Sequence, residues 1–310
     1  MRIVFMGTPE FAVQTLKACI EHHEVVAVFT QPDKPKGRGN KMTSSEIKVE
    51  ADKHGIPVLQ PEKIRKDNWP EVIRQYAPDV MVVVAYGQLL SQEILDIPKF
   101  GSINVHASLL PKYRGAAPIN WAIANGETET GVTTMLMDAG LDTGDMLLKD
   151  YVSIDGDMNA QVLHDLLAQS GANLLIETLS QLEAGTLKPE KQSESPTAYA
   201  SMLNKDIARV DWKMNSIEIR NRIRAFNPWP IAHTMLEDAS LKIFRSTLIH
   251  EDGFSDDAPG TIVKTDKLGI YVQTGNGILR IDELQWGSNK RMPTQAFLLG
   301  NHIQTGTKLY

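Results

Sequence analysis

The first half of the chain alternates short apolar runs with longer segments of helical periodicity. Apolar runs at 2–6, 25–30, 79–85 and 101–106 predict strands, and the residues between them predict helices. The run 79–85 is apolar on both faces, as in a central strand of a parallel sheet. This alternation predicts an α/β domain with a Rossmann-like, doubly wound and mostly parallel sheet.

The turn after the first strand predicts the start of a helix. Thr8 is a candidate N-cap and Pro9 a candidate first helical residue, with the helix running to about Glu21. The turn lacks the G-x-G-x-x-G pattern and Pro9 removes a backbone donor, so it favours a plain strand-to-helix turn over a dinucleotide site.

The pattern changes in the second half. Strands are predicted at 131–137 and 145–154, followed by a long helix over 159–183. The segment 188–198 is polar, contains two prolines and predicts a linker. Beyond it, a helix at 216–226 precedes short alternating segments separated by glycines, which predict a small antiparallel, OB-like β-barrel. We therefore expect domains at 1–187 and 206–310, joined by a linker at 188–205.

Composition narrows the class of protein. The chain has 310 residues, of which 42% are hydrophobic and 23% charged, as in ordinary globular proteins. The single cysteine, Cys19, excludes an internal disulfide and a zinc site built from several cysteines, so no metal is expected. The longest apolar run is too short to span a bilayer. These features predict a cytoplasmic protein without membrane attachment, and a net charge of −6 argues weakly against general nucleic-acid binding.

The strand at 101–106 carries the most informative polar pair. Because strand residues alternate in direction, Asn104 and His106 point to the same side, where the strand opens into Ser108-Leu109-Leu110-Pro111. An amide donor beside an imidazole can hold a polarised carbonyl oxygen. The alternative is a satisfied polar pair at the end of a core strand, and these residues alone leave both interpretations open.

Asp142 is a second candidate, in a loop between two glycines. Its carboxylate can serve the turn itself, which is the ordinary role of aspartate there. If it lies beside His106, it sets the tautomer of the imidazole and favours its protonated form.

Two basic segments are candidate phosphate-binding sites. The segment 31–41 has no apolar anchor and is expected to be mobile until an anion orders it; its cations are Lys34, Lys36, Arg38 and Lys41. Arg220 and Arg224 share one face of the helix at 216–226. For both segments the alternative is a solvated surface.

Together these residues resemble the methionyl-tRNA formyltransferases, a family that uses 10-formyltetrahydrofolate. The resemblance covers nearly the whole chain and rests on the following segments: 2–9, 82–87, 103–111, 114–119, 140–145 and 224–230. The Asn-x-His, Ser-Leu-Leu-Pro and Asp set is shared by folate-dependent formyltransferases in general. The acceptor assignment depends on the basic segment and the second domain.

The resemblance implies transfer of a formyl group from 10-formyltetrahydrofolate to the α-amino group of methionyl initiator tRNA. It implies catalytic roles for Asn104, His106 and Asp142 and folate contacts from Ser108, Leu109, Leu110 and Pro111. It also implies that the segment at about 32–43 enters the acceptor end of the tRNA with Arg38 as its key residue, and that the second domain binds tRNA. We expect the tRNA-contacting set to be Lys34, Lys36, Arg38, Lys41, Arg220 and Arg224, and the protein to be a monomer.

Two other functions stay open at this point. A formyltransferase acting on a small amine, such as an amino-sugar nucleotide or glycinamide ribonucleotide, would share the catalytic set without needing the basic segment. An RNA-binding protein on an inactive α/β scaffold would share the second domain, but it leaves the catalytic set unexplained.

Overall fold

The computed structural model describes residues 1–36, 41–249 and 257–310 and divides the chain into two compact units. Unit 1 contains Met1–Pro118, Glu129–Ser153 and His164–Ala200, and unit 2 contains the remaining described residues. Most of the polar segment expected to be a linker therefore groups with unit 1. The division of the chain at 187 and 206 stays a prediction.

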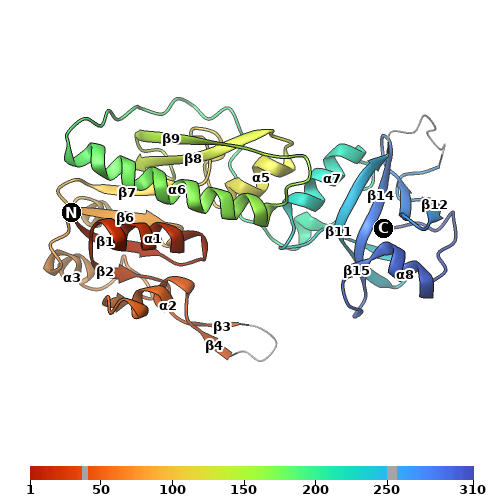
Figure 1. Cartoon of the computed structure of the whole chain (residues 1–310), viewed down its shortest axis with the longest axis horizontal. Helices are drawn as coiled ribbons and strands as arrows, with labels where there is room; N and C mark the ends of the chain where they lie inside the picture. Colours follow the sequence, from red (N-terminus) through yellow and green to blue (C-terminus); the bar gives the residue numbers. More distant parts are fainter. Residues whose placement is uncertain (37–40, 250–256) are drawn as a thin grey trace. The chain divides into compact units, whose positions relative to one another are not determined.

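Unit 1 is built on a seven-stranded sheet in the order β5-β2-β1-β6-β7-β8-β9 (Figure 1). The strands from β5 to β7 are parallel, whereas β8 and β9 are antiparallel to their neighbours. The mostly parallel, Rossmann-like sheet is thus confirmed. The strand bounds are β1 (Arg2–Gly7), β2 (Glu24–Phe29), β5 (Val58–Leu59), β6 (Val80–Val84), β7 (Ser102–His106), β8 (Glu129–Leu136) and β9 (Met146–Ser153).

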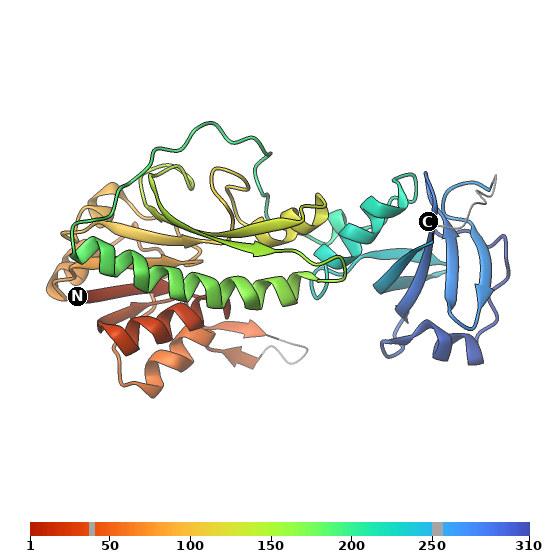
Figure 2. The same cartoon turned by 45° about the horizontal axis from the view of Figure 1, so that its top comes forward.

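Helices cover this sheet. They are α1 (Phe11–His22), α2 (Glu46–Lys53), α3 (Trp69–Gln75), α4 (Gln92–Leu95) and the long α6 (Ala160–Glu183). α1 and α6 lie side by side (Figures 1 and 2), and the rings of Phe11 and His164 meet edge to face at 5.4 Å. A Cβ on Gly171 would lie 2.8 Å from Val105 Cγ1, so glycine allows α6 to pack closely on β7.

The predicted start of the first helix is wrong. α1 begins at Phe11 with Glu10 as its N-cap, rather than with Thr8 and Pro9. The Thr8 hydroxyl instead donates to the Tyr86 carbonyl at 2.9 Å and accepts from the Gln31 backbone N–H at 3.3 Å. Thr8 therefore ties together the chain segments that follow β1, β2 and β6, at the edge where the carboxyl ends of the parallel strands meet.

The sequence predicts no strand in the basic segment, but its described parts pair as antiparallel strands, β3 (Lys34–Lys36) and β4 (Lys41–Thr43). Arg38 lies outside the described residues. At the base of the hairpin, Asp33 accepts hydrogen bonds from Gln60 at 2.7 Å and from Lys48 at 2.9 Å. These hydrogen bonds, that of Gln60 first, lower the pKa of the Asp33 carboxyl. These contacts fix the first end of the hairpin to Lys48 of α2 and to Gln60, which follows β5.

Unit 2 is an antiparallel sheet in the order β10-β11-β14-β13-β12, with β15 paired to β14. Its strands are β10 (His233–Leu236), β11 (Ala239–Ile249), β12 (Ile262–Asp266), β13 (Gly269–Gln273), β14 (Ile278–Trp286) and β15 (Met292–Pro293), and its helices are α7 (Ser216–Ala225), α8 (Thr294–Gly300) and most of α5 (Pro118–Ala124). An Asn215–Glu218 capping box starts α7, which buries Ile219 and Ile223 in the core of the unit.

The last residues of the chain join the two edges of this sheet. Leu309 forms a bridge with Leu236 of β10, and Lys308 forms a bridge with Thr261, next to β12. The backbone N–H of Ile262 also donates to the Thr307 carbonyl at 2.8 Å. The terminal segment thus closes the sheet in the manner of a small barrel, consistent with the OB-like prediction.

Candidate active site

The polar pair predicted from the strand pattern lies at the C-terminal end of β7. Asn104 pairs with Val83 of β6 on one side and with Met135 of β8 on the other, and His106 pairs with Thr133 of β8. β7 is therefore an interior strand at which the sheet changes from parallel to antiparallel. Ligands of such sheets bind beyond the carboxyl ends of the parallel strands, which is where this pair lies.

His106 is buried and its ring is oriented by one hydrogen bond. Nε2 lies 3.0 Å from the Tyr113 carbonyl oxygen, which can only accept, so Nε2 carries a proton. Nδ1 lies 3.8 Å from Asp142 Oδ1, which is too far for a hydrogen bond but within ion-pair distance. In the neutral ring Nδ1 can therefore accept a proton, and the resulting imidazolium faces a carboxylate.

Asp142 is held in place from two sides. It lies in the loop between β8 and β9 with φ +55°, a left-handed conformation that costs a non-glycine residue about 1–3 kcal/mol. Its Oδ2 accepts from the Gly115 backbone N–H at 2.9 Å, and its main-chain oxygen accepts from Gln192 at 2.9 Å. The approach of Asp142 to His106, which the sequence left open, is thus present in the structure, and the second carboxylate oxygen is occupied by the backbone.

A cavity of about 290 Å³ in unit 1 is lined by both Asn104 and Asp142. In the described part of the chain, no hydrogen bond occupies the Asn104 amide, and the buried Tyr86 hydroxyl has no partner either. Burial raises the pKa of Tyr86, so its hydroxyl remains a donor. Other lining residues include Arg65, Val83, Gln88, Leu90, Leu95, Met135, Met137, Asp138 and Tyr199.

The predicted folate contacts at 108–111 do not line the cavity. Among the described residues that do, Asn104 and Asp142 are present, whereas His106 and Ser108–Pro111 are not. Ser108 Oγ donates to the Lys112 carbonyl at 2.6 Å, and the Leu110 N–H donates to Thr133 Oγ1 at 3.0 Å. These bonds hold the turn that presents the Tyr113 carbonyl to His106. The direct folate role of the four residues stays a prediction.

Sequence reasoning missed several residues of this site. Arg65, Gln88 and Tyr199 line the cavity, although none of the three was selected as a candidate site residue from the sequence. Gln192 contacts the Asp142 loop from the polar segment that predicts a linker. Contacts between distant segments of the chain bring these side chains to the site, and no local sequence pattern predicts them.

Unit 2 contains a larger cavity, of about 690 Å³, lined by Arg220, Arg224, Arg245, Arg280 and Arg291. We call these residues the arginine cleft. Arg220 pairs with the exposed Asp157, whereas Arg224 donates to the carbonyls of Asp155 at 3.1 Å and Met158 at 2.9 Å. Burial, and then the charge of Arg220, lower the pKa of Arg224. The cleft therefore brings together the two arginines predicted on α7 and three that lie outside the predicted tRNA-contacting set.

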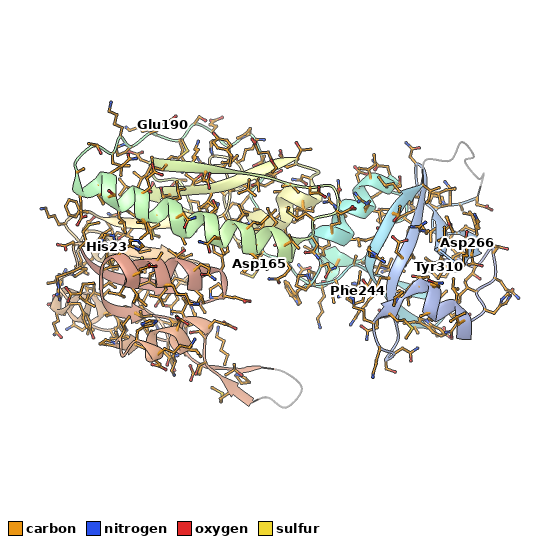
Figure 3. All side chains as sticks on the ribbon, viewed as in Figure 1. His23, Asp165, Glu190, Phe244, Asp266 and Tyr310 are labelled. Atoms are coloured by element: carbon orange, nitrogen blue, oxygen red, sulfur yellow. The ribbon has the colours of Figure 1, made fainter. Side chains whose placement is uncertain are left out.

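Two further arginines of the cleft are anchored by carboxylates. Arg280 donates to Asp282 at 2.6 Å, and Arg291 donates through Nε and Nη2 to the two oxygens of Glu283, both at 2.8 Å. The Arg291 guanidinium also stacks 4.3 Å from the ring centroid of Phe244, a β11 residue labelled in Figure 3. Arg245 of the same strand is exposed. The cleft thus combines fixed guanidinium groups with an exposed one.

Acid should destabilise unit 2 partly through Glu283. The hydrogen bond from Arg291 lowers the pKa of this carboxyl below its usual range, so its contribution to stability is present above about pH 4.3 and is lost as pH falls through the native pKa. We expect Glu283→Gln to lower the Tm at pH 7 and to flatten the loss of Tm between about pH 5 and pH 3. Thermal melting across that range measures the effect. Glu237→Gln, which removes an exposed carboxylate, is the matched control and should leave the slope unchanged.

Comparison with known proteins assigns both halves of the chain. The formyl transferase family model matches residues 1–179, and the formyl transferase C-terminal domain model matches residues 202–302. The methionyl-tRNA formyltransferase of Geobacter sulfurreducens is 53% identical over 100% of this chain and 96% of its own length. That of Clostridium perfringens is 51% identical over 100% of both chains.

Solved structures share the fold at lower identity. WlaRD, a sugar 3N-formyl transferase studied with dTDP and 5-N-formyl-THF, has a TM-score of 0.67 and 23% identity, over 94% of this chain and 98% of its own. The N-formyltransferase of Helicobacter canadensis, in complex with folinic acid and dTDP-3-aminofucose, has a TM-score of 0.66 and 21% identity, over 90% of this chain and 98% of its own. At this identity the likeness concerns the fold alone.

Proposed function

The chain belongs to the formyl transferase family, and from that premise we propose that it transfers a formyl group from 10-formyltetrahydrofolate to the α-amino group of methionyl initiator tRNA. The observation that carries this proposal is that Asp142 lines the same cavity as Asn104 and lies 3.8 Å from His106, the second polar residue at the end of β7. The relatives that match the full chain at 51–53% identity are methionyl-tRNA formyltransferases. This favours a charged tRNA as the acceptor over the small amines of the sugar formyltransferases.

The first chemical requirement is a neutral amine. A free α-amino group has a pKa of about 7.7–8.0, so much of it is protonated near neutral pH. His106 Nδ1 is the nitrogen without a hydrogen-bonded proton, and we assign it the role of accepting the amine proton as the N–C bond to the formyl carbon forms. Asp142, 3.8 Å away, stabilises the imidazolium that results.

The second requirement is stabilisation of the negative charge that develops on the formyl oxygen. Asn104 lines the cavity, and its amide is not occupied by any hydrogen bond in the described residues, so it can donate to this oxygen. One donor of this kind contributes about 2.7–4 kcal/mol to the transition state. The bond between the formyl carbon and N10 of the folate then breaks, and the proton held by His106 passes to N10. This returns the His106 imidazole to its neutral state.

The donor is assigned to the cavity of unit 1. Its volume of about 290 Å³ suits one ring system of a folate rather than the whole molecule. Apolar groups such as Val83 and Leu90 can cover the faces of a ring, and the Tyr86 hydroxyl is a polar atom without a partner among the described residues. Ser108–Pro111 are proposed to assist by shaping the turn beside it.

The acceptor is assigned to the basic groups of both units. Lys34 is exposed on β3 of the hairpin, and Lys36, Arg38 and Lys41 complete its predicted cations. In the arginine cleft, Arg220 can exchange the exposed Asp157 for a phosphate. The Arg224 guanidinium already donates to two backbone carbonyls, so its predicted contact with tRNA would require a phosphate to replace these partners.

Formylation assays on matched acceptors test the proposal. Methionyl initiator tRNA, methionyl elongator tRNA and an amino-sugar nucleotide are compared with 10-formyltetrahydrofolate as donor. We expect the initiator tRNA to be strongly preferred. Preference for the small amine would replace the proposed acceptor, and the absence of transfer to any acceptor would remove the enzymatic proposal.

The basic hairpin supplies a separate prediction. Arg38→Ala should lower kcat/KM for methionyl-tRNA by about 10–100-fold, as expected for loss of a charge-assisted phosphate contact, and should leave the KM for folate unchanged. Steady-state kinetics with each substrate varied in turn measure both. Lys66→Ala removes an exposed cation elsewhere in unit 1 and serves as the control. Unchanged tRNA kinetics in Arg38→Ala would mean that the basic segment is a solvated surface segment without a role in tRNA recognition.

We further propose that the protein acts in the cytoplasm, where initiator tRNA is charged and used, and that it acts as a monomer. No helix in the described ranges is long and apolar enough to cross a membrane. Light scattering with and without tRNA tests the monomer, since a mass of twice 34.4 kDa in free protein would contradict it.

A further inference from the structure

The polar segment Lys188–Ala200 follows α6 and is attached to unit 1 along its length. We call it the strap. At one end, the N–H and carbonyl of Glu190 exchange hydrogen bonds of 2.8 Å with Met146, where β9 begins, and Figure 3 labels Glu190 on this segment. At the other end, Ala200 accepts from the backbone N–H groups of Ala116 and Ala117. Chain of this composition predicts a linker, so its regular attachment calls for an explanation.

Gln192 joins the strap to the loop that carries Asp142. Its Nε2 donates to the main-chain oxygens of Asp142 at 2.9 Å and Gly144 at 2.7 Å. Its Oε1 accepts from Arg114 Nε at 2.9 Å. The next residue, Gly115, donates its backbone N–H to Asp142 Oδ2 at 2.9 Å. The Gln192 side chain therefore links the backbone of the Asp142 loop to Arg114, and the next residue, Gly115, holds the Asp142 carboxylate.

Thr197 joins the strap to the hydrogen-bond partner of His106. The backbone N–H of Tyr113 donates to Thr197 Oγ1 at 2.7 Å. The carbonyl of the same residue, Tyr113, accepts from His106 Nε2 at 3.0 Å. A displacement of Tyr113 would thus rotate or release the imidazole, while a displacement of the Asp142 loop would change the 3.8 Å separation between the two groups.

The backbone of the site adds a reason for such support. Asp142 and Tyr113 both have positive φ, +55° and +56° respectively, which non-glycine residues hold only where their surroundings over-determine them. A Cβ on Gly115 would lie 2.6 Å from the Ala200 carbonyl oxygen, so the end of the strap packs directly on the backbone of Gly115, two residues after Tyr113. The strap provides fixed partners at each of these positions.

We propose that Gln192 and Thr197 are positioning residues for formyl transfer: they set the separation and orientation of Asp142 and His106 without touching either substrate. The inference rests on the proposed function. If so, loss of either side chain should lower the rate of the chemical step, because misplacing a reacting group by about 1 Å can cost 10²-fold in rate. Substrate binding should be unaffected, because the cavity and the basic surfaces are left intact.

Gln192→Glu is the sharpest test, because the two side chains have the same shape. Glutamate still accepts from Arg114, but it has no donor for the carbonyls of Asp142 and Gly144. We expect kcat for formylation to fall by about 10–100-fold, with the KM for folate and for methionyl-tRNA within about twofold of wild type. Glu194→Gln is the converse change at an exposed strap residue and should leave all three constants unchanged.

The Thr197 arm supplies a rescue. Thr197→Val keeps the branched shape and removes the acceptor for the Tyr113 N–H, whereas Thr197→Ser keeps the hydroxyl. We expect kcat to fall in the valine variant and to return to within about twofold of wild type in the serine variant. Thermal melting is measured for every variant at the assay pH. Should Gln192→Glu fail to fold, the Thr197 pair decides.

The outcomes separate the two proposals. Failure of the wild-type protein to formylate methionyl-tRNA would reject the proposed function itself. If the wild type is active, a normal kcat in both Gln192→Glu and Thr197→Val would overturn the positioning role. A raised KM with unchanged kcat would also overturn it, because the strap would then be part of a binding surface.

Discussion

Asn104→Asp should lower kcat for formyl transfer by about 10²–10³-fold while leaving the affinity for methionyl-tRNA nearly unchanged. The substitution keeps the shape of the side chain on β7 but replaces its N–H donors with an anion. That anion would face the oxygen on which negative charge develops as the amine attacks the formyl carbon. Single-turnover formylation at saturating folate and tRNA measures the chemical step directly.

The control is Asn173→Asp, the same chemical change at an exposed position of α6. It should keep the wild-type single-turnover rate. If Asn104→Asp retained a near-normal rate, the oxyanion role of Asn104 would be wrong. In that case Asn104 would be a polar residue at the end of a core strand that takes no part in the chemical step.

Asp142→Asn should lower kcat by about 10²–10⁴-fold, the usual contribution of a positioned acid–base unit. The asparagine oxygen can still accept from the Gly115 N–H, so the loop keeps its anchor, while an uncharged NH2 group replaces the carboxylate oxygen beside His106. The imidazolium that forms during the reaction would then lack its counter-ion. The measurement is kcat across pH 6–9 for both proteins.

Glu129→Gln removes one exposed carboxylate from β8 and serves as the charge control. It should leave the kcat profile unchanged. A profile for Asp142→Asn that overlays the wild-type profile would mean that His106 works without a carboxylate partner. The carboxylate would then serve only the turn.

The parts of this structure that follow from the sequence are those with a local cause. The apolar pattern at 79–85 predicts an interior strand because such a strand is buried on both faces, and β6 is buried throughout. Strand alternation places Asn104 and His106 on one side of β7 for an equally local reason. The roles assigned to these residues came instead from the resemblance to a family, which local pattern alone could not replace.

The parts that did not follow depend on contacts between distant segments. Threonine is a common N-cap residue, yet the Thr8 hydroxyl donates to the carbonyl of Tyr86, which follows another strand of the sheet. Gln192 lies in a segment whose polarity and prolines favour a linker, yet it binds the Asp142 loop. In both places a long-range hydrogen bond outweighs the local preference, and no periodicity in the sequence records that bond.

The terminal segment of unit 2 has a consequence for how the protein behaves in concentrated solution. Exposed strand edges are templates on which other molecules can add strands and aggregate. Leu309 occupies the β10 edge and Lys308 the residue next to β12, so the terminal segment covers both edges at these positions. Removing Lys308–Tyr310 would uncover backbone donors and acceptors there, and the shortened chain would gain a tendency to precipitate even where its catalytic unit remained folded.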